Sequence, residues 1–180
     1  MRLLALDQAS RTSGYAVFID GKLECHGKFT AEHEDIGERL HFIRENVAKL
    51  IADYDIDHIA FEDIQLQQTV NGQQSINNVQ TFKVLAEVFG VIYELAIALD
   101  LPYTVVLAST WKSTLLIKGA RRDEQKRNAQ AFAQSTYNIK CTQDEADAIC
   151  IGTHILVKEG AIQKPKTKTS VGTTEGFDWS

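Results

Sequence analysis

Apolar and polar residues follow two kinds of repeat along this chain, and each repeat predicts a different element. Short apolar or alternating runs are typical of strands, and five such runs occur, at residues 2–7, 14–19, 22–30, 57–62 and 103–107. Apolar residues at helical spacing predict four longer helices, at residues 35–53, 76–99, 123–137 and about 143–159. A short helix is also expected through Leu116, capped by Ser109 or Thr110.

The order of these elements predicts how the strands pair. Asp20-Gly21 separates the second and third strands and is a signal for a two-residue hairpin turn. The chain is therefore expected to begin with three antiparallel strands. The next helix leads into the fourth strand, and this crossover favours parallel pairing with the first strand. We predict an α/β fold with a five-stranded mixed sheet, three antiparallel strands followed by parallel strands, and helices on both faces.

The pattern weakens near the C-terminus. Residues 160–180 alternate Lys with Pro and Thr and then become rich in Gly, Ser and Thr, which predicts a flexible tail. Residues 1–159 are expected to form one domain, long enough to bury a substantial core.

The amino-acid composition predicts which class of protein this is and in which cellular compartment it works. With 44% hydrophobic and 24% charged residues, the chain is typical of a soluble globular protein. It has neither an apolar run of transmembrane length nor the pattern of a signal peptide, so no membrane partner is expected. The 3 cysteines are an odd number without C-x-x-C spacing. They favour reduced thiols in the cytoplasm over a zinc site.

The distribution of charge matters more than its sum. The formal net charge is -5, which by itself argues against a nucleic-acid partner. One stretch is strongly basic, however, with only Asp123 and Glu124 to oppose six cations: Lys112, Lys118, Arg121, Arg122, Lys126 and Arg127. These six residues are predicted to contact DNA, although a solvated loop and helix start would have the same composition.

Four acids stand where buried elements begin or end. Asp7 and Glu62 close the first and fourth strands, and Asp144 and Asp147 are one turn apart at the start of the last helix. Each acid alone has an ordinary structural explanation, such as a turn or a helix N-terminus. Together they would repel one another strongly unless a divalent cation lay between them. Such hard oxygen ligands suit Mg²⁺, with Mn²⁺ as a substitute.

Paired metal ions of this kind serve phosphodiester hydrolysis, because one ion activates water while the other stabilises the leaving oxygen. We therefore expect two ions per site, with Asp7 between them in the middle of the sheet. Glu145 lies about 100° around the helix from Asp144 and is predicted to be a solvated acid favoured by the helix dipole. His154 and Trp111 are predicted to be packed side chains, and Ser10 and Ser13 to satisfy the turn after Asp7.

Three segments of the chain form an ordered set: Leu4-Ala5-Leu6-Asp7-Gln8-Ala9-Ser10-Arg11-Thr12-Ser13-Gly14-Tyr15-Ala16-Val17, Ile59-Ala60-Phe61-Glu62 and Asp144-Glu145-Ala146-Asp147-Ala148. Read in this order, they resemble the RuvC family of Holliday-junction resolvases, within the RNase H-like superfamily of nucleases. The likeness covers roughly residues 1 to 158. It departs from the family at Gln8-Ala9, where Pro-Gly is usual, and over the polar residues 65–78. The short chain and this divergent stretch look more like the phage-encoded branch, which would place the protein in a bacterial host cytoplasm.

The resemblance implies an RNase H-like nuclease domain and metal-dependent cleavage of Holliday junctions. It gives catalytic and metal-binding roles to Asp7, Glu62, Asp144 and Asp147. Lys112 and Lys126 resemble the basic residues that line the family's active site, where either would hold the scissile phosphate. A purely electrostatic contact with DNA explains each lysine equally well.

Residues 65–78 lie beside the predicted site because they follow the strand that ends in Glu62. The stretch is rich in Gln and Asn and lacks the apolar tip that a base-unstacking wedge needs. We therefore expect broad cutting of branched DNA, including four-way junctions, forks and flaps, with little preference for base sequence. A mobile polar loop with no DNA contact is the alternative explanation for this stretch.

The apolar face over 79–96 is wider than one sheet face requires. Part of it is predicted to form a homodimer interface, which would match the two-fold symmetry of a junction. Gly90 in that helix would permit close approach of another backbone. Packing within a single chain remains an alternative explanation.

Two other functions stay open at this stage. A catalytically silent protein that binds branched DNA would share most of these features. The turn from Asp7 to Gly14 also resembles the first phosphate loop of actin-like and sugar-kinase ATPases. Those proteins normally have two domains and a second Gly-rich loop, and this chain has neither.

Overall fold

The computed structural model describes residues 1–65 and 76–165 of the chain. It contains five strands: β1 (Arg2–Asp7), β2 (Thr12–Ile19), β3 (Lys22–Thr30), β4 (His58–Glu62) and β5 (Tyr103–Val106). The helices are α1 (Ile36–Asp53), α2 (Ile76–Ala98), α3 (Ala108–Thr114), α4 (Arg122–Tyr137) and α5 (Gln143–Lys158). All of the predicted elements are present in their predicted order.

The sheet confirms the predicted pairing. Its strand order is β3-β2-β1-β4-β5, with the first three strands antiparallel and β1, β4 and β5 parallel. Leu6 pairs with Phe61, so the next residue on each strand, Asp7 and Glu62, emerges at the same edge of the sheet. The hairpin between β2 and β3 turns at Asp20 and Gly21, with φ of 49° and 79°, as a tight two-residue turn requires.

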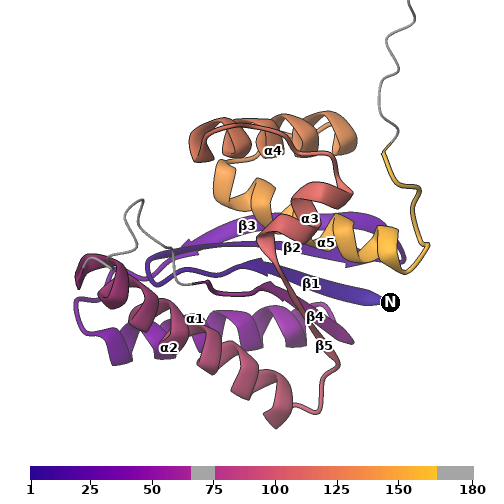
Figure 1. The fold of residues 1–180 in the computed structure, drawn as a ribbon. Helices are drawn as coiled ribbons and strands as arrows, with labels where there is room; N and C mark the ends of the chain where they lie inside the picture. The colour runs from indigo at the N-terminus through magenta and orange to yellow at the C-terminus, as the bar shows by residue number, and fades with distance from the viewer. Residues whose placement is uncertain (66–75, 166–180) are drawn as a thin grey trace, which may run out of the picture.

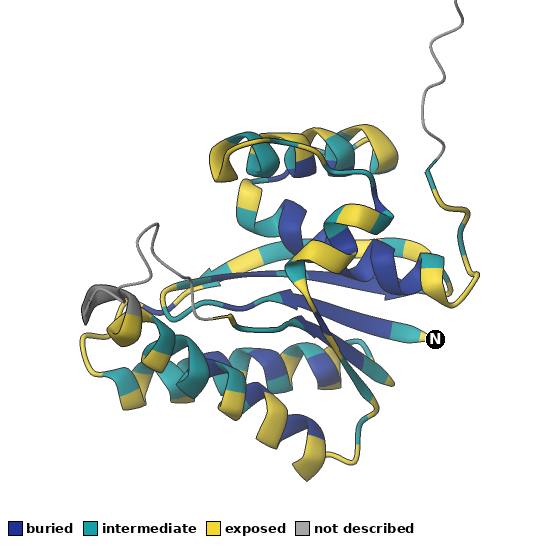
Figure 2. Cartoon of the chain, in the orientation of Figure 1, coloured by how far each residue is buried: buried dark blue, intermediate teal, exposed yellow. Residues whose placement is uncertain are grey.

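Helices cover both faces of the sheet, as predicted. The pair α1 and α2 lies on one face, while α5 lies on the other beneath α3 and α4 (Figure 1). Phe61 packs into the α1–α2 layer and Ala60 into the α5 layer, because neighbouring residues of a strand point to opposite faces. Figure 2 shows buried residues concentrated in β1, β2, β4 and α5, whereas β3 at the edge of the sheet is intermediate or exposed.

The structure corrects some helix boundaries and caps. Helix α3 begins one residue before the proposed caps, at Ala108, and its N-cap is Leu107 without a side-chain hydrogen bond. Helix α4 begins at Arg122, one residue earlier than expected. Thr142 does cap α5, in a reciprocal capping box with Glu145.

Two sequence predictions fall mainly on residues that the structure does not describe. The polar stretch 65–78 is described only at its ends, and 166–180 of the predicted tail lie outside the described residues. Within the described residues, no helix is long and apolar enough to cross a membrane.

Candidate active site

A cavity of about 500 Å³ opens where the ends of β1 and β4 meet the start of α5. All four predicted acids line it: Asp7, Glu62, Asp144 and Asp147. Three of the predicted basic residues line it as well: Lys112, Arg122 and Lys126. A larger, more open depression of about 730 Å³ at the start of α1 contains none of these residues. The charged cavity is therefore the candidate active site.

Helix α5 brings its own two acids, Asp144 and Asp147, to the cavity because the helix packs closely against the sheet. A Cβ at Gly14 would stand 2.0 Å from the backbone oxygen of Asp144, and a Cβ at Gly152 would stand 2.2 Å from the ring of Phe18. Both separations are far shorter than van der Waals contact, so only glycine fits at either position. These two glycines set the height of α5 over the sheet and thereby bring Asp144 and Asp147 to the cavity.

Asp7 lies at the centre of this negative charge. Its carboxylate is surrounded mostly by protein, and burial raises the pKa of Asp7 well above its ordinary value of 3.8. The neighbouring charges of Asp147, Glu62 and Asp144 raise that pKa further, while Lys126 lowers it. The site therefore holds more negative charge than its own cation compensates.

Lys126 is the cation nearest to the α5 acids. Its Nζ lies 3.1 Å from Asp147 and 3.8 Å from Asp144. Burial lowers the pKa of Lys126, but attraction to Asp147 and Asp7 outweighs this effect and leaves the pKa raised. Because α4 begins at Arg122, Lys126 lies in the second turn of this helix, where its Nζ points at the acids.

Glu62 is held from two directions. The indole Nε1 of Trp111 donates a hydrogen bond to its Oε2 at 2.8 Å. The side-chain amide of Gln8 bonds both backbone groups of Glu62, donating to its carbonyl and accepting from its N–H at 3.1 Å. Gln8 thus continues the β1–β4 ladder by one step through its side chain. Burial raises the pKa of Glu62, and the bond from Trp111 lowers it.

The second lysine of the cavity is also held. Lys112 Nζ lies 5.2 Å from the centre of the Trp111 ring and donates to Gln125 Oε1 at 3.1 Å. The first contact is within the range of a cation–π interaction. Trp111 is buried, as predicted, but its indole also links an acid of the site to a lysine of the site.

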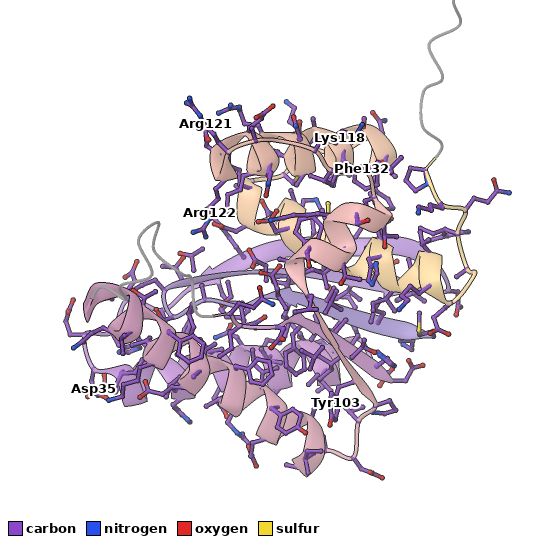
Figure 3. All side chains as sticks on the ribbon, viewed as in Figure 1. Asp35, Tyr103, Lys118, Arg121, Arg122 and Phe132 are labelled. Atoms are coloured by element: carbon purple, nitrogen blue, oxygen red, sulfur yellow. The ribbon has the colours of Figure 1, made fainter. Side chains whose placement is uncertain are left out.

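The remaining basic residues are more peripheral. Lys118 and Arg121 belong to the segment between α3 and α4, and Figure 3 shows both on the outer side of α4, with Arg122 on its cavity side. Arg127 is exposed and pairs with Asp123 at 3.0 Å, which takes up part of its charge. The predicted basic run therefore divides into residues that line the cavity and residues that surround it.

The donor set fits a divalent cation by its chemistry. Four carboxylates face one cavity, and Lys126 is the only cation that contacts the pair on α5 among residues 1–65 and 76–165. That charge imbalance suits Mg²⁺ or Mn²⁺. In the described part of the chain, no group of three His, Cys, Asp or Glu side chains is already gathered closely enough to hold an ion.

One acid was assigned wrongly from the sequence. Glu145 points away from the cavity, as expected, but it is not a solvated first-turn acid. Its carboxylate accepts from the N–H and hydroxyl of Thr142 and lies 3.0 Å from His26 Nδ1. These contacts lower the pKa of Glu145 despite its partial burial. Its role is to fix the start of α5 and to tie that helix to β3.

Other predictions for single residues are confirmed. Ser13 is buried and exchanges hydrogen bonds with the backbone of Ala9 at 3.0 Å, so it closes the turn after Asp7. His154 is buried and bonds Thr114 at 2.9 Å, which joins α5 to α3. The turn therefore forms without the Pro-Gly pair that is usual in the resembled family.

Sequence analysis missed Gln8 and Gln125 as residues of the site. Gln8 was noted only as a departure from the family pattern, although its place directly after Asp7 was a signal. Gln125 has no such signal in the sequence. Its side chain forms hydrogen bonds with Gly119 and Lys112, which are 6 and 13 positions away.

Comparison with known proteins places this site in context. No protein-family model matches the sequence. A crossover junction endodeoxyribonuclease RuvC from Trichlorobacter lovleyi is 29% identical over 135 residues, covering 69% of this chain and 68% of the relative. RuvC from Pelobacter propionicus is 26% identical over an alignment covering 94% of this chain and 97% of the relative. The predicted resemblance to RuvC is confirmed.

Solved structures agree in fold. Thermus thermophilus RuvC in complex with a Holliday junction substrate has a TM-score of 0.68 at 13% identity, covering 89% of this chain and 98% of that one. The yeast mitochondrial Holliday junction resolvase Ydc2 has a TM-score of 0.55 at 16% identity, covering 89% of this chain and 79% of that one. The predicted RNase H-like fold is thereby confirmed.

Proposed function

We propose that this protein is a Holliday-junction resolving endonuclease of the RuvC type that hydrolyses phosphodiester bonds with divalent metal. The observation that carries the proposal is the convergence of four acids from β1, β4 and α5 on one cavity that basic side chains also line. The similarity to RuvC relatives over most of the chain supports the choice of branched DNA as the substrate.

Asp7, Glu62, Asp144 and Asp147 would hold Mg²⁺ or Mn²⁺, in two ions per site. Bound metal supplies a nucleophilic water and stabilises charge on the leaving oxygen. The protein's own residues prepare this chemistry. Gln8 and the β1–β4 register fix the distance between Asp7 and Glu62, and Gly14 fixes the height of Asp144. Pre-set acids lose little free energy to reorganisation when the substrate arrives.

Lys112, Arg122 and Lys126 are proposed to contact the scissile phosphate. All three line the cavity, and they come from α3 and α4, opposite the strand ends that carry Asp7 and Glu62. A phosphate between the two sets would meet cations on one side and metal-bearing carboxylates on the other. Lys126 would exchange part of its contact with Asp147 for the phosphate.

A cleavage assay tests the function directly. End-labelled four-way junction, fork, flap and duplex DNA are incubated with the protein and Mg²⁺ or Mn²⁺, and in parallel with EDTA. We expect metal-dependent cuts near the branch point of all three branched substrates and no cleavage of duplex. Asp100→Asn, which removes an acid from a turn remote from the cavity, serves as the control and should cleave normally.

The outcome also separates the competing functions. Tight junction binding without cleavage in either metal would favour a catalytically silent binder. Cleavage restricted to four-way junctions, at one short sequence, would contradict the broad substrate range inferred from residues 65–78. No cleavage and no preference for branched DNA would overturn the proposal.

We also propose that the protein is a homodimer through the outer side of α2. Apolar or small residues recur there at coiled-coil spacing: Val79, Phe82, Ala86, Gly90, Tyr93 and Ile97. Val79 is 50% exposed and Ile97 is 59% exposed, and a Cβ at Gly90 would meet nothing within 4 Å. Among residues 1–65 and 76–165, the close approach expected at Gly90 is thus absent, which leaves room for a second helix. Figure 2 shows this exposed side of α2.

Sedimentation equilibrium tests the dimer. Ile97→Glu places a charge on an exposed residue at the C-terminal end of the proposed contact and should shift the protein to monomer. Leu107→Glu, at another exposed apolar residue outside α2, should leave the mass unchanged. A monomeric wild-type protein at micromolar concentration would show that α2 is not an interface.

A further inference from the structure

Gln125 lies between Lys112, one of the two lysines that line the cavity, and the basic segment that precedes α4. It belongs to the first turn of α4, is half-buried and lines the cavity. Its Oε1 accepts from Lys112 Nζ at 3.1 Å, and its Nε2 donates to the carbonyl of Gly119 at 2.9 Å. The two ends of one planar amide therefore hold two different segments of the chain.

The segment held by Gln125 is a loop fastened to α4 at three successive residues. We call residues 118–121 the basic loop, since they precede α4 and include Lys118 and Arg121. Asn128 donates to the carbonyl of Lys118 at 2.6 Å, and Glu124 accepts from the N–H of Ala120 at 2.9 Å. Gln125 supplies the middle attachment, at Gly119.

Gly119 allows the loop to lie close against the helix. Its φ is 152°, and a Cβ there would stand 2.9 Å from the backbone nitrogen of Gln125. The loop backbone and the first turn of α4 are therefore in direct contact. A shift of the loop at Gly119 must move the Gln125 amide or break its hydrogen bond.

The other end of the path reaches an acid of the active site. Lys112, bound to Gln125, also lies over the Trp111 ring, and Trp111 donates to Glu62. An ammonium on a four-carbon stem has many rotamers, and these two contacts restrict Lys112 to the side of the cavity near Glu62. Polar and cation–π contacts thus run without a break from Glu62 to the basic loop.

We propose that Gln125 is a positioning residue that couples DNA contact at the basic loop to the placement of Lys112 beside the acids. The inference rests on the proposed nuclease function. When phosphates bind Lys118 and Arg121, the loop is fixed, and the Gln125 amide holds Lys112 in register with it. The residue touches neither the reacting bond nor metal, and it acts through Lys112.

Three variants separate the two ends of the amide. Gln125→Met keeps the shape of the side chain and removes both hydrogen bonds. Gln125→Glu keeps the acceptor for Lys112, as a stronger charged pair, but cannot donate to Gly119. Asn128→Ala removes a loop attachment and leaves Lys112 untouched. Gln134→Met is the matched control, because its partner, the carbonyl of Cys141, is also held by Gln130.

Each variant is measured for junction affinity in EDTA and for the single-turnover cleavage rate at saturating junction DNA with Mg²⁺. We expect Gln125→Met to lower the cleavage rate about 10- to 100-fold, as small misplacements of catalytic groups do, and to weaken affinity. Gln125→Glu and Asn128→Ala should weaken affinity a fewfold while the bound complex cleaves within about threefold of wild type. Gln134→Met should match wild type in both.

A role in folding alone predicts a different result. Gln125→Met would then lower the thermal midpoint and leave the cleavage rate of the bound complex unchanged, which would overturn the inference. Equal slowing of the chemistry by Gln125→Met and Asn128→Ala would also overturn it, since Asn128 has no contact with Lys112. If Gln125→Met does not fold, Gln125→Glu decides: it keeps the acceptor for Lys112, so slow cleavage by its bound complex would contradict the proposed path. Failure of the wild type to cleave would instead count against the proposed function.

Discussion

At the scale of single residues, the site depends on charges that protein surrounds. Asp7 and Glu62 lose water at the ends of buried strands, and burial raises the pKa of both. A group whose pKa is raised in the folded state binds protons more tightly there than in the unfolded chain. Its ionisation therefore destabilises the fold, so that stability is lost as pH rises from the unfolded pKa through the folded pKa.

Asp7→Asn tests this at the central acid. Without metal, the variant should be more stable than wild type at neutral pH, with the difference vanishing as pH falls below the unfolded value near 3.8. In a domain of this size, each kcal/mol added to the free energy of unfolding should raise the thermal midpoint by about 2–4 °C. Thermal denaturation in EDTA across a pH series measures it. The same variant should lose at least about 100-fold in cleavage, and equal stability at all pH values would contradict the account.

Trp111→Phe tests the hydrogen bond to Glu62. Phenylalanine fills most of the same space but cannot donate, so the pKa of Glu62 should rise further. Glu62 then loses its charge at a higher pH, and the acid limb of the pH–rate profile should move upward. Loss of a hydrogen bond to a charged group is expected to lower the cleavage rate about tenfold. A slower enzyme with an unmoved profile would show that Trp111 acts only through packing.

At the scale of elements, the position of α5 decides whether the acids meet. The capping box at Thr142 starts the helix, and His26 ties that start to β3 through Glu145. Gly14 and Gly152 then let α5 lie directly against β2. Local capping thus determines where the helix begins, and close packing determines how near its first two turns come to Asp7.

Gly14→Ala should disturb this approach. Its new Cβ would lie 2.0 Å from the Asp144 oxygen, so the start of α5 must move, at about 1–3 kcal/mol as in other overpacked cores. We expect a lower thermal midpoint and a loss of cleavage beyond what reduced folding explains. Gly90→Ala is the matched control for stability, since its Cβ would meet nothing within 4 Å in the described part of the chain. It should stabilise the monomer fold by about 0.5–1 kcal/mol, because alanine favours helix.

At the scale of the whole molecule, a chain with a formal net charge of -5 presents cations around one cavity. Helices α3 and α4 carry these cations above α5, on the face opposite α1 and α2 (Figure 1). Phosphate contacts release counterions, so their number appears in the dependence of affinity on salt. The local arrangement of charge, rather than the overall balance, therefore governs DNA binding.

Junction affinity should fall steeply as salt rises. On a plot of log association constant against log salt concentration, Lys118→Ala, Arg121→Ala or Arg122→Ala should each reduce the slope by about 0.9. Lys49→Ala, on α1 in the opposite layer and paired with Asp53, should leave the slope unchanged. Fluorescence anisotropy with a labelled junction measures these slopes. A salt-independent affinity would exclude the basic loop as the DNA surface.

The sequence alone determined the elements, their order, the sheet pairing and the four acids. These features follow from local rules, namely apolar periodicity, turn residues and caps, which leave their marks within a few adjacent residues. Asp20-Gly21 and Thr142 are examples, since each acts on its immediate neighbours. The resemblance to RuvC is also a property of ordered short segments, so it too was available before the fold.

Only the tertiary structure decided which partners each side chain takes. Glu145 is a local anchor for α5 because His26, 119 residues away in sequence, lies beside it. Gln8 completes the β1–β4 ladder, and Gln125 joins Lys112 to the basic loop, because folding brings separate segments within hydrogen-bond distance. Side-chain hydrogen bonds of this kind have no period and no fixed spacing. They are set by packing between layers, which the amino-acid pattern of any one segment does not specify.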